Sequence, residues 1–146
     1  MAESVLIISG SRSDDGVVDR ITPVLDELGI EWKYEIASAH RDPEKVKKIV
    51  KSTFADVIIA VAGLSAALPG VVAAHTLVPV IGVPVSAKLE GMDALLSIVQ
   101  MPPGVPVAAV GIDNGRNAAL LAAQILALKN KGLEKKLVRY REKMKK

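Results

Sequence analysis

The stretch Val5-Leu6-Ile7-Ile8-Ser9-Gly10-Ser11-Arg12-Ser13-Asp14 joins a continuous apolar run to a glycine-serine turn. An apolar run without alternation is typical of a central parallel strand that helices cover on both faces. Apolar residues at helical spacing follow over 17–28, and Gly29 suits the C-cap of that helix. Strand, turn and helix in this order predict the first unit of a parallel α/β sheet.

The same pattern recurs along the chain. Further strands are expected at 30–36, 55–61, 79–85 and 105–112. Further helices are expected at 43–53, 71–74, 91–100 and 117–128. The run 30–36 alternates apolar and charged residues, which predicts an edge strand with one face exposed to solvent. The sequence therefore predicts a doubly wound parallel sheet in a three-layer α/β/α sandwich of flavodoxin-like type.

Composition narrows the class of protein. The 146 residues are 50% hydrophobic, enough for one domain with its own core. No apolar run approaches the roughly 20 residues of a membrane span, and no secretory signal pattern is present, so we expect a cytoplasmic protein. The sequence contains no cysteine, which excludes a disulfide framework, a thiol nucleophile and a cysteine-ligated metal.

Positive charge is concentrated at the C-terminal end. Residues 129–146 hold nine Lys or Arg against two Glu, whereas residues 1–128 hold ten Lys or Arg against fourteen acidic residues. One apolar stripe at helical spacing is made by Leu133, Leu137, Tyr140 and Met144. We expect a single α/β domain over 1–128, with a basic amphipathic helix over 129–146 that packs on it or on a neighbouring subunit. No stacking aromatics are interleaved with the charges, which argues against nucleic-acid binding.

A histidine and an arginine stand together at the second strand-to-helix junction, Ala37-Ser38-Ala39-His40-Arg41-Asp42-Pro43. Asp42 suits an N-cap and Pro43 a first helical position, so both side chains lie where a helix begins and an anion is favoured. Histidine exchanges protons near neutral pH, and the planar guanidinium of arginine can donate two hydrogen bonds to one phosphate. The plain structural alternative is a hydrogen-bonded loop histidine beside a surface arginine.

Ligands in open α/β sheets bind at the carboxyl ends of the strands. The loops expected at that edge are 10–15, 37–43, 62–70 and 84–90. They bring together the polar residues Ser11, Ser13, Asp14, Ser38, His40, Arg41 and Ser65. Loop 62–70 consists almost wholly of small residues, which is typical of a loop where a ligand packs close to the backbone. Neither a G-x-G-x-x-G nor a P-loop lysine pattern occurs, which favours a small monophosphate over a dinucleotide or a nucleoside triphosphate. Ser13 and Asp14 could alternatively be ordinary helix caps.

Five motifs occur in order over about three quarters of the chain. They are Gly10-Ser11-Arg12-Ser13-Asp14, Ser38-Ala39-His40-Arg41-Asp42-Pro43, Ala62-Gly63 with Leu68-Pro69-Gly70, Pro79-Val80-Ile81-Gly82-Val83-Pro84 and Ser97-Ile98-Val99-Gln100-Met101-Pro102. This set resembles the PurE family of purine biosynthesis, which comprises N5-carboxyaminoimidazole ribonucleotide mutases and aminoimidazole ribonucleotide carboxylases. The resemblance implies a three-layer α/β/α fold, a homo-octamer with sites at subunit contacts, and an imidazole mononucleotide as substrate.

The resemblance also implies roles for single residues. His40 and Ser38 match the catalytic pair at the imidazole, with the histidine handling the proton. Ser11, Ser13 and Asp14 match the motif that holds phosphate and a ribose hydroxyl, and Arg41 matches a phosphate ligand. The other expected substrate-binding residues are Gly10, Ala39, Gly63, Ser65 and Leu68. No metal or other cofactor is implied, and CO2 is an intermediate or a co-substrate.

One position departs from the pattern of many mutases, which carry a histidine where this chain has Ala67. Loop 62–68 instead is similar to the branch that carboxylates aminoimidazole ribonucleotide with free CO2, whereas Arg41, 79–84 and 97–102 are similar to the mutase branch. Direct carboxylation is therefore the alternative reaction. Two further alternatives are a pyridine mononucleotide carboxylase of nickel-pincer cofactor synthesis and a non-catalytic mononucleotide-binding module.

Overall fold

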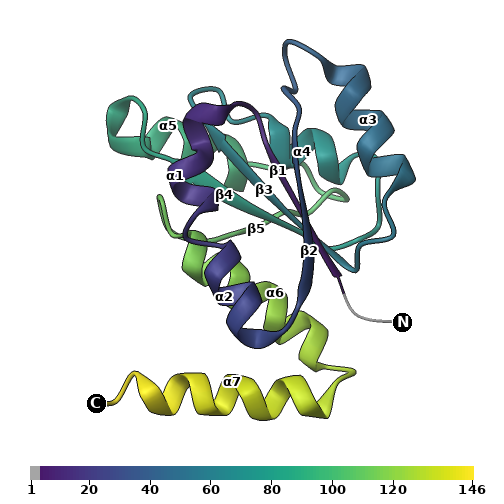
Figure 1. The fold of residues 1–146 in the computed structure, drawn as a ribbon. Helices are drawn as coiled ribbons and strands as arrows, with labels where there is room; N and C mark the ends of the chain where they lie inside the picture. The colour runs from purple at the N-terminus through teal and green to yellow at the C-terminus, as the bar shows by residue number, and fades with distance from the viewer. Residues whose placement is uncertain (1–3) are drawn as a thin grey trace.

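The computed structural model describes residues 4–146, which form a parallel sheet flanked by helices (Figure 1). The strands are β1 (Ser4–Ser9), β2 (Glu31–Ile36), β3 (Val57–Gly63), β4 (Val80–Val85) and β5 (Ala108–Ala109). They are all parallel and lie in the order β2-β1-β3-β4-β5. This is the flavodoxin-like order, so the predicted fold class is confirmed.

Helices cover both faces of the sheet. They are α1 (Asp15–Val18), α2 (Thr22–Leu28), α3 (Pro43–Ser52), α4 (Leu68–Ala73), α5 (Met92–Val99), α6 (Gly115–Ala127) and α7 (Lys131–Lys143), with short 3-10 turns η1 (Arg12–Asp14) and η2 (Leu89–Gly91). One hydrophobic cluster joins the sheet to α1, α2 and α6, and the other joins it to α3, α4 and α5. In Figure 1, α2 and α6 lie between the sheet and α7.

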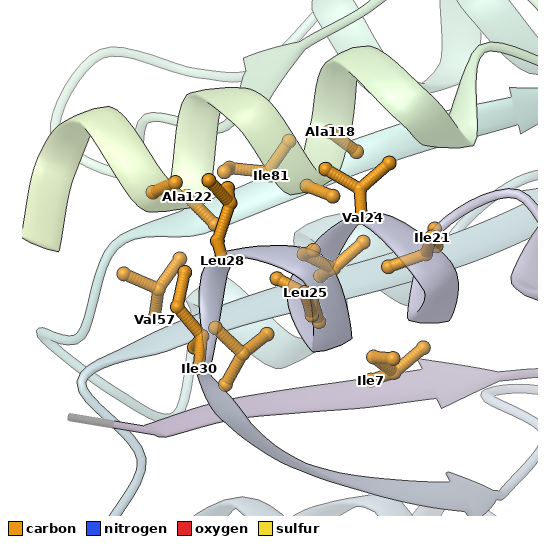
Figure 2. Close-up of a cluster of buried hydrophobic side chains, with 14 of the residues drawn as sticks. Ile7, Ile21, Val24, Leu25, Leu28, Ile30, Val57, Ile81, Ala118 and Ala122 are labelled. Atoms are coloured by element: carbon orange, nitrogen blue, oxygen red, sulfur yellow. The ribbon is translucent and has the colours of Figure 1, made fainter. Parts of the chain in front are cut away.

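The first cluster uses small side chains to bring α6 close to the sheet (Figure 2). Ala118 and Ala122 of α6 are fully buried beside Ile81 of β4 and Leu28 of α2. The helix begins at Gly115, where an added Cβ would lie 2.5 Å from the carbonyl oxygen of Val17. Any larger residue there would push α6 away from α1.

The second cluster is equally tight at β4. Gly82 lies between α4 and α5, where an added Cβ would be 2.6 Å from Ile98 Cγ2 and 3.2 Å from Pro69 Cβ. Ile98 is fully buried, so it has little room to move aside. The glycine therefore sets the distance between these two helices and the sheet.

Prolines explain where the elements differ from the expected ranges. The helix predicted over 17–28 is two helices, because Pro23 occupies the first turn of α2 and proline is excluded from a helix interior. Gly29 ends α2 with a left-handed φ of 71°, as predicted. The strand predicted over 105–112 pairs only at 108–109. Pro106 has no N–H for the ladder on the N-terminal side, and beyond the strand Val110 N donates to the carbonyl of Gly82 at 3.3 Å. The helix predicted from 71 begins at Leu68, with Pro69 in its first turn.

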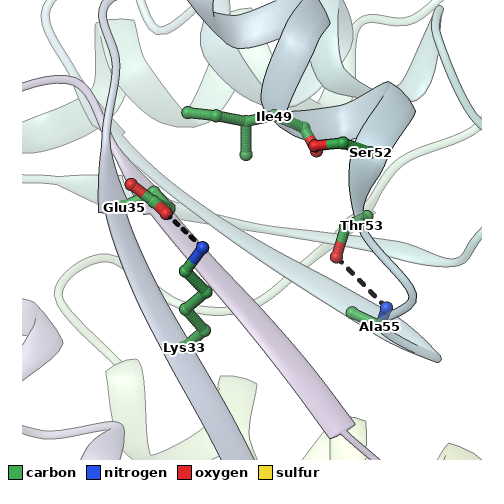
Figure 3. A network of polar contacts seen from close by, with 6 residues as sticks. All are labelled: Lys33, Glu35, Ile49, Ser52, Thr53 and Ala55. Atoms are coloured by element: carbon green, nitrogen blue, oxygen red, sulfur yellow. Dashed lines mark hydrogen bonds and ion pairs between the residues drawn. The ribbon is translucent and has the colours of Figure 1, made fainter.

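The edge position predicted for the alternating strand is confirmed, because β2 pairs only with β1 among the described strands. Lys33 and Glu35 share the face of β2 toward α3 and form an ion pair of 2.6 Å (Figure 3). Lys33 is largely exposed, so the pair contributes little to stability. A short turn links α3 to β3, and in it Ala55 N donates to Thr53 Oγ1 at 3.1 Å (Figure 3).

Helix α7 packs on α2 and α6 of its own chain. Leu133 is buried and Leu137 and Tyr140 are partly buried, while Met144 at the end of the predicted stripe is 62% exposed. Lys136 Nζ donates to the carbonyl of Leu28 at 2.9 Å, at the C-terminal end of α2. Contact of α7 with a neighbouring subunit stays a prediction.

None of the helices within residues 4–146 is long and apolar enough to traverse a lipid bilayer.

The packing at Gly82 leads to a stability test. We expect Gly82→Ala to lower the free energy of unfolding by about 1–3 kcal/mol, because the added methyl overlaps Ile98. Gly16→Ala in α1 is the matched control, since an added Cβ there has no atom within 4 Å. Urea denaturation of both variants measures the difference. Equal stability of the two variants would contradict this account of the layer spacing.

Candidate active site

A cavity of about 710 Å³ opens at the carboxyl ends of β1, β2 and β3, the edge where the strand order reverses. All eleven predicted site residues line it: Gly10, Ser11, Ser13, Asp14, Ser38, Ala39, His40, Arg41, Gly63, Ser65 and Leu68. Its size falls within the range of small-molecule sites, about 300–1,000 Å³. The structure thus brings together residues from three loops that are far apart in sequence.

The turn after β1 presents hydroxyl groups to the cavity. Ser11 is the N-cap of η1 and accepts from the backbone N–H of Ser13 at 3.3 Å, and the two serine hydroxyls are in contact. An added Cβ at Gly10 would meet no atom within 4 Å, so the backbone there is open to a ligand. Ser11 is therefore the side-chain cap of η1, while Asp14 stands at the N-cap position of α1 without a side-chain cap bond, and all three residues Ser11, Ser13 and Asp14 line the cavity.

Asp14 is a buried acid in the cavity wall. Burial raises the pKa of its carboxyl, and the neighbouring charge of Asp15 adds to the rise. The backbone N–H groups of Ser11 and Gly10 bond to the carboxyl and lower its pKa, without cancelling the effect of burial. An acid that costs stability to bury is typical of a functional position.

The turn after β2 carries His40 and Arg41. Ser38 Oγ accepts from Arg41 N at 3.1 Å and from Arg41 Nε at 3.4 Å. Arg41 Nη2 donates to the carbonyl oxygen of Gly10 at 3.4 Å, so the guanidinium spans the two turns. These long contacts leave guanidinium donors for an anion.

Helix α3 begins beside this turn as predicted, with Asp42 as N-cap and Pro43 in its first turn. Asp42 Oδ1 accepts from Lys45 N at 3.1 Å. The cap thus satisfies one donor of the helix N-terminus. An anion in the cavity would meet mainly Arg41 and the turn 10–14.

His40 is the only histidine that lines the cavity, and its side chain is exposed. The second histidine, His75, lies in the turn that follows α4 and is absent from the lining. His40 is thus the one imidazole in the wall that can exchange a proton with a bound ligand. In the described part of the chain, no group of His, Asp or Glu could hold a metal ion.

The loop after β3 forms a largely apolar wall, with Ser65 as its one polar side chain. Gly63 faces Val85, where an added Cβ would lie 3.4 Å from Val85 Cβ, and Leu64 has a left-handed φ of 52°. Ala62, Leu64, Ala67 and Ala87 also line the cavity but were absent from the predicted set. They have no polar or titratable group that could mark them as site residues in a sequence.

The chain is similar to known proteins over its whole described length. A family model described as "AIR carboxylase" matches residues 4–146. A curated N5-carboxyaminoimidazole ribonucleotide mutase of Methanocaldococcus jannaschii is 61% identical, covering 97% of this chain and 90% of that protein. Another, from Pyrococcus abyssi, is 50% identical, covering 95% and 82%. The crystal structure of Treponema denticola PurE2-S38D has a TM-score of 0.90 at 34% identity, covering 98% and 91%.

Burial of Asp14 makes stability depend on pH. The pKa of this carboxyl is higher in the folded protein than in the unfolded chain. Folding stability therefore falls as pH rises from the pKa of the unfolded chain through the pKa of the folded protein. Asp14→Asn removes the buried charge, and we expect a higher melting temperature at pH 7 and a flatter pH dependence in the acidic range. Asp19→Asn, at an exposed position, should leave both unchanged. A loss of stability at pH 7 in Asp14→Asn would contradict the assigned cost.

Proposed function

This chain belongs to the AIR carboxylase family, and we propose that it is an N5-carboxyaminoimidazole ribonucleotide mutase of purine biosynthesis. It would convert N5-carboxyaminoimidazole ribonucleotide to 4-carboxy-5-aminoimidazole ribonucleotide. One observation carries the proposal: a turn with Ser38, His40 and Arg41 faces the turn 10–14 across one cavity. The shared name of the relatives from Methanocaldococcus and Pyrococcus supports the same reaction.

The cavity offers a separate place for each part of a mononucleotide. Arg41 supplies positive charge, and the hydroxyls of Ser11 and Ser13 supply donors, which together suit the phosphate. The carboxyl of Asp14 can accept from a ribose hydroxyl. The imidazole ring would then lie toward Ser38 and His40, against the loop after β3.

The reaction moves a carboxylate from nitrogen to carbon and a proton the opposite way. The carbamate N–C bond breaks, CO2 leaves, and the electron pair stays on the exocyclic nitrogen, which takes a proton. The ring carbon then attacks CO2 to form the C–C bond, and loss of its proton restores the aromatic ring. One acid-base group can serve both proton transfers, and His40 is suited to this because imidazole gains and loses protons near neutral pH.

CO2 must stay in place between the two steps. Ala62 and Leu68 are buried and line the cavity with Gly63, so these three residues offer CO2 an apolar surface. The scheme uses no metal ion, nucleoside triphosphate or redox cofactor. We also propose a cytoplasmic location.

Direct carboxylation of aminoimidazole ribonucleotide with free CO2 is the second candidate. It is favoured by the absence of any titratable side chain in loop 62–68, where Ala67 lines the cavity.

A homo-octamer also remains part of the proposal. It is supported by the exposed apolar face of α5, where Met92, Leu96 and Val99 are about half exposed, next to the exposed Leu89.

A steady-state assay separates the two reactions. The purified protein receives either the carbamate substrate, or aminoimidazole ribonucleotide with high bicarbonate, and the carboxylated product is followed. We expect efficient turnover of the carbamate. Turnover with the unmodified nucleotide alone would instead assign direct carboxylation, and no product from either would contradict both reactions.

The role of His40 is tested by substitution. We expect His40→Asn to lower kcat by about 10²–10⁴, the usual contribution of a general acid-base group. Calorimetric binding of the product should persist, because the phosphate ligands are unchanged. His75→Asn, outside the cavity, is the control and should retain full activity. Full activity in His40→Asn would remove this residue from the mechanism.

A further inference from the structure

Tyr34 makes a polar contact that neither the fold nor the cavity lining explains. It lies on β2 opposite Ile7 of β1, on the face covered by α1 and α2. Its hydroxyl is 2.8 Å from Asp15 Oδ1, to which it donates, and 2.5 Å from Ser9 Oγ. The hydroxyl therefore connects an edge strand with two residues that flank the turn 10–14.

Those two residues hold the ends of that turn. Ser9 is the last residue of β1 and is fully buried. Its hydroxyl donates a hydrogen bond to the carbonyl oxygen of Ser11 at 3.2 Å. Asp15 begins α1, directly after Asp14. One phenol thus bonds to both sides of the segment that presents Ser11 and Ser13 to the cavity.

We propose that Tyr34 is a positioning residue that holds the turn 10–14 in the shape that receives the substrate phosphate. This inference rests on the proposed function, since it assigns the phosphate to that turn. Tyr34 is absent from the cavity lining, so it acts through Ser9 and Asp15. Arg41 Nη2 also donates to the carbonyl of Gly10, so the guanidinium assigned to the phosphate contacts the same turn.

The phenol is able to donate at every physiological pH. Burial, the hydrogen bond to Asp15 and the nearby acidic charges together raise the pKa of Tyr34 to about 12, although the hydrogen bond with Ser9 lowers it. Its proton is therefore retained for Asp15. Ser9 Oγ keeps its own single proton, which it can direct to Ser11 or to the phenol oxygen.

Packing alone would not require the hydroxyl. The ring of Tyr34 packs against the first hydrophobic cluster, and phenylalanine would fill the same space. Burying polar groups between β1, β2 and α1 has a desolvation cost, which their mutual hydrogen bonds offset. The trio of Ser9, Asp15 and Tyr34 is therefore better explained by the precise position of the turn than by stability of the core.

The test compares Tyr34→Phe with wild type in the carbamate assay. We expect KM to rise about tenfold, as for loss of one hydrogen bond to a carboxylate, with kcat within about twofold because the His40 turn is unchanged. Ser9→Ala should raise KM similarly, and the double variant should show less than the product of the two effects. Tyr140→Phe removes the other phenol of the chain, on α7, and should leave KM unchanged.

Amide hydrogen exchange without substrate provides a second readout, which does not depend on the assigned reaction. We expect faster exchange over 10–15 in Tyr34→Phe, with no change over 43–52 in α3. Unchanged KM and unchanged exchange in a folded Tyr34→Phe protein would overturn the proposal, as would a fall in kcat at constant KM. If wild type turns over neither substrate, the proposed function fails, while the exchange data still decide whether Tyr34 holds the turn.

Discussion

The central strands β1 and β3 are covered by helices on both faces, and this burial determines where polar chemistry can be placed. Their side chains are almost all apolar, so neither face of the sheet can hold a polar ligand. The loops at the carboxyl edge are the remaining positions close to both strands. Right-handed parallel connections bring the turn 10–14, the turn 38–42 and the loop after β3 to the same edge.

Close approach of the helices depends on small residues. Gly82 allows α4 and α5 to lie against β4 at distances that a Cβ would prevent. Gly115 does the same for the contact between α6 and α1. The alanines of α6 have the same effect over a longer contact. This tight scaffold matters for the site, because the loops at the edge are anchored at both ends by elements that cannot shift far.

The site itself contains features that oppose stability. Asp14 is a buried acid with a raised pKa, Ser9 is a buried hydroxyl, and Leu64 adopts a left-handed backbone conformation. Each has an energetic cost that an apolar, relaxed alternative would avoid. All three lie at the cavity or directly behind it, while the other non-glycine residues with a left-handed φ, Leu89, Glu90 and Asp113, lie outside the cavity lining. Such costs at a binding site are expected where ligand binding and stability make different demands on the chain.

Local sequence determined the strand and helix types, the edge position of β2, the caps at Gly29 and Asp42, and which loops carry the polar residues of the cavity. Each of these depends on neighbours in the chain: apolar periodicity, special backbone angles, and loops that follow strands. The break before α2 and the start of the β5 pairing follow from Pro23 and Pro106, which are local features of the sequence. Only the tertiary structure decided the bonds of Tyr34 to Ser9 and Asp15. The Tyr34 bonds join residues 19 and 25 positions apart, and no local pattern encodes such a contact, because it exists only once β1 and β2 are paired in register.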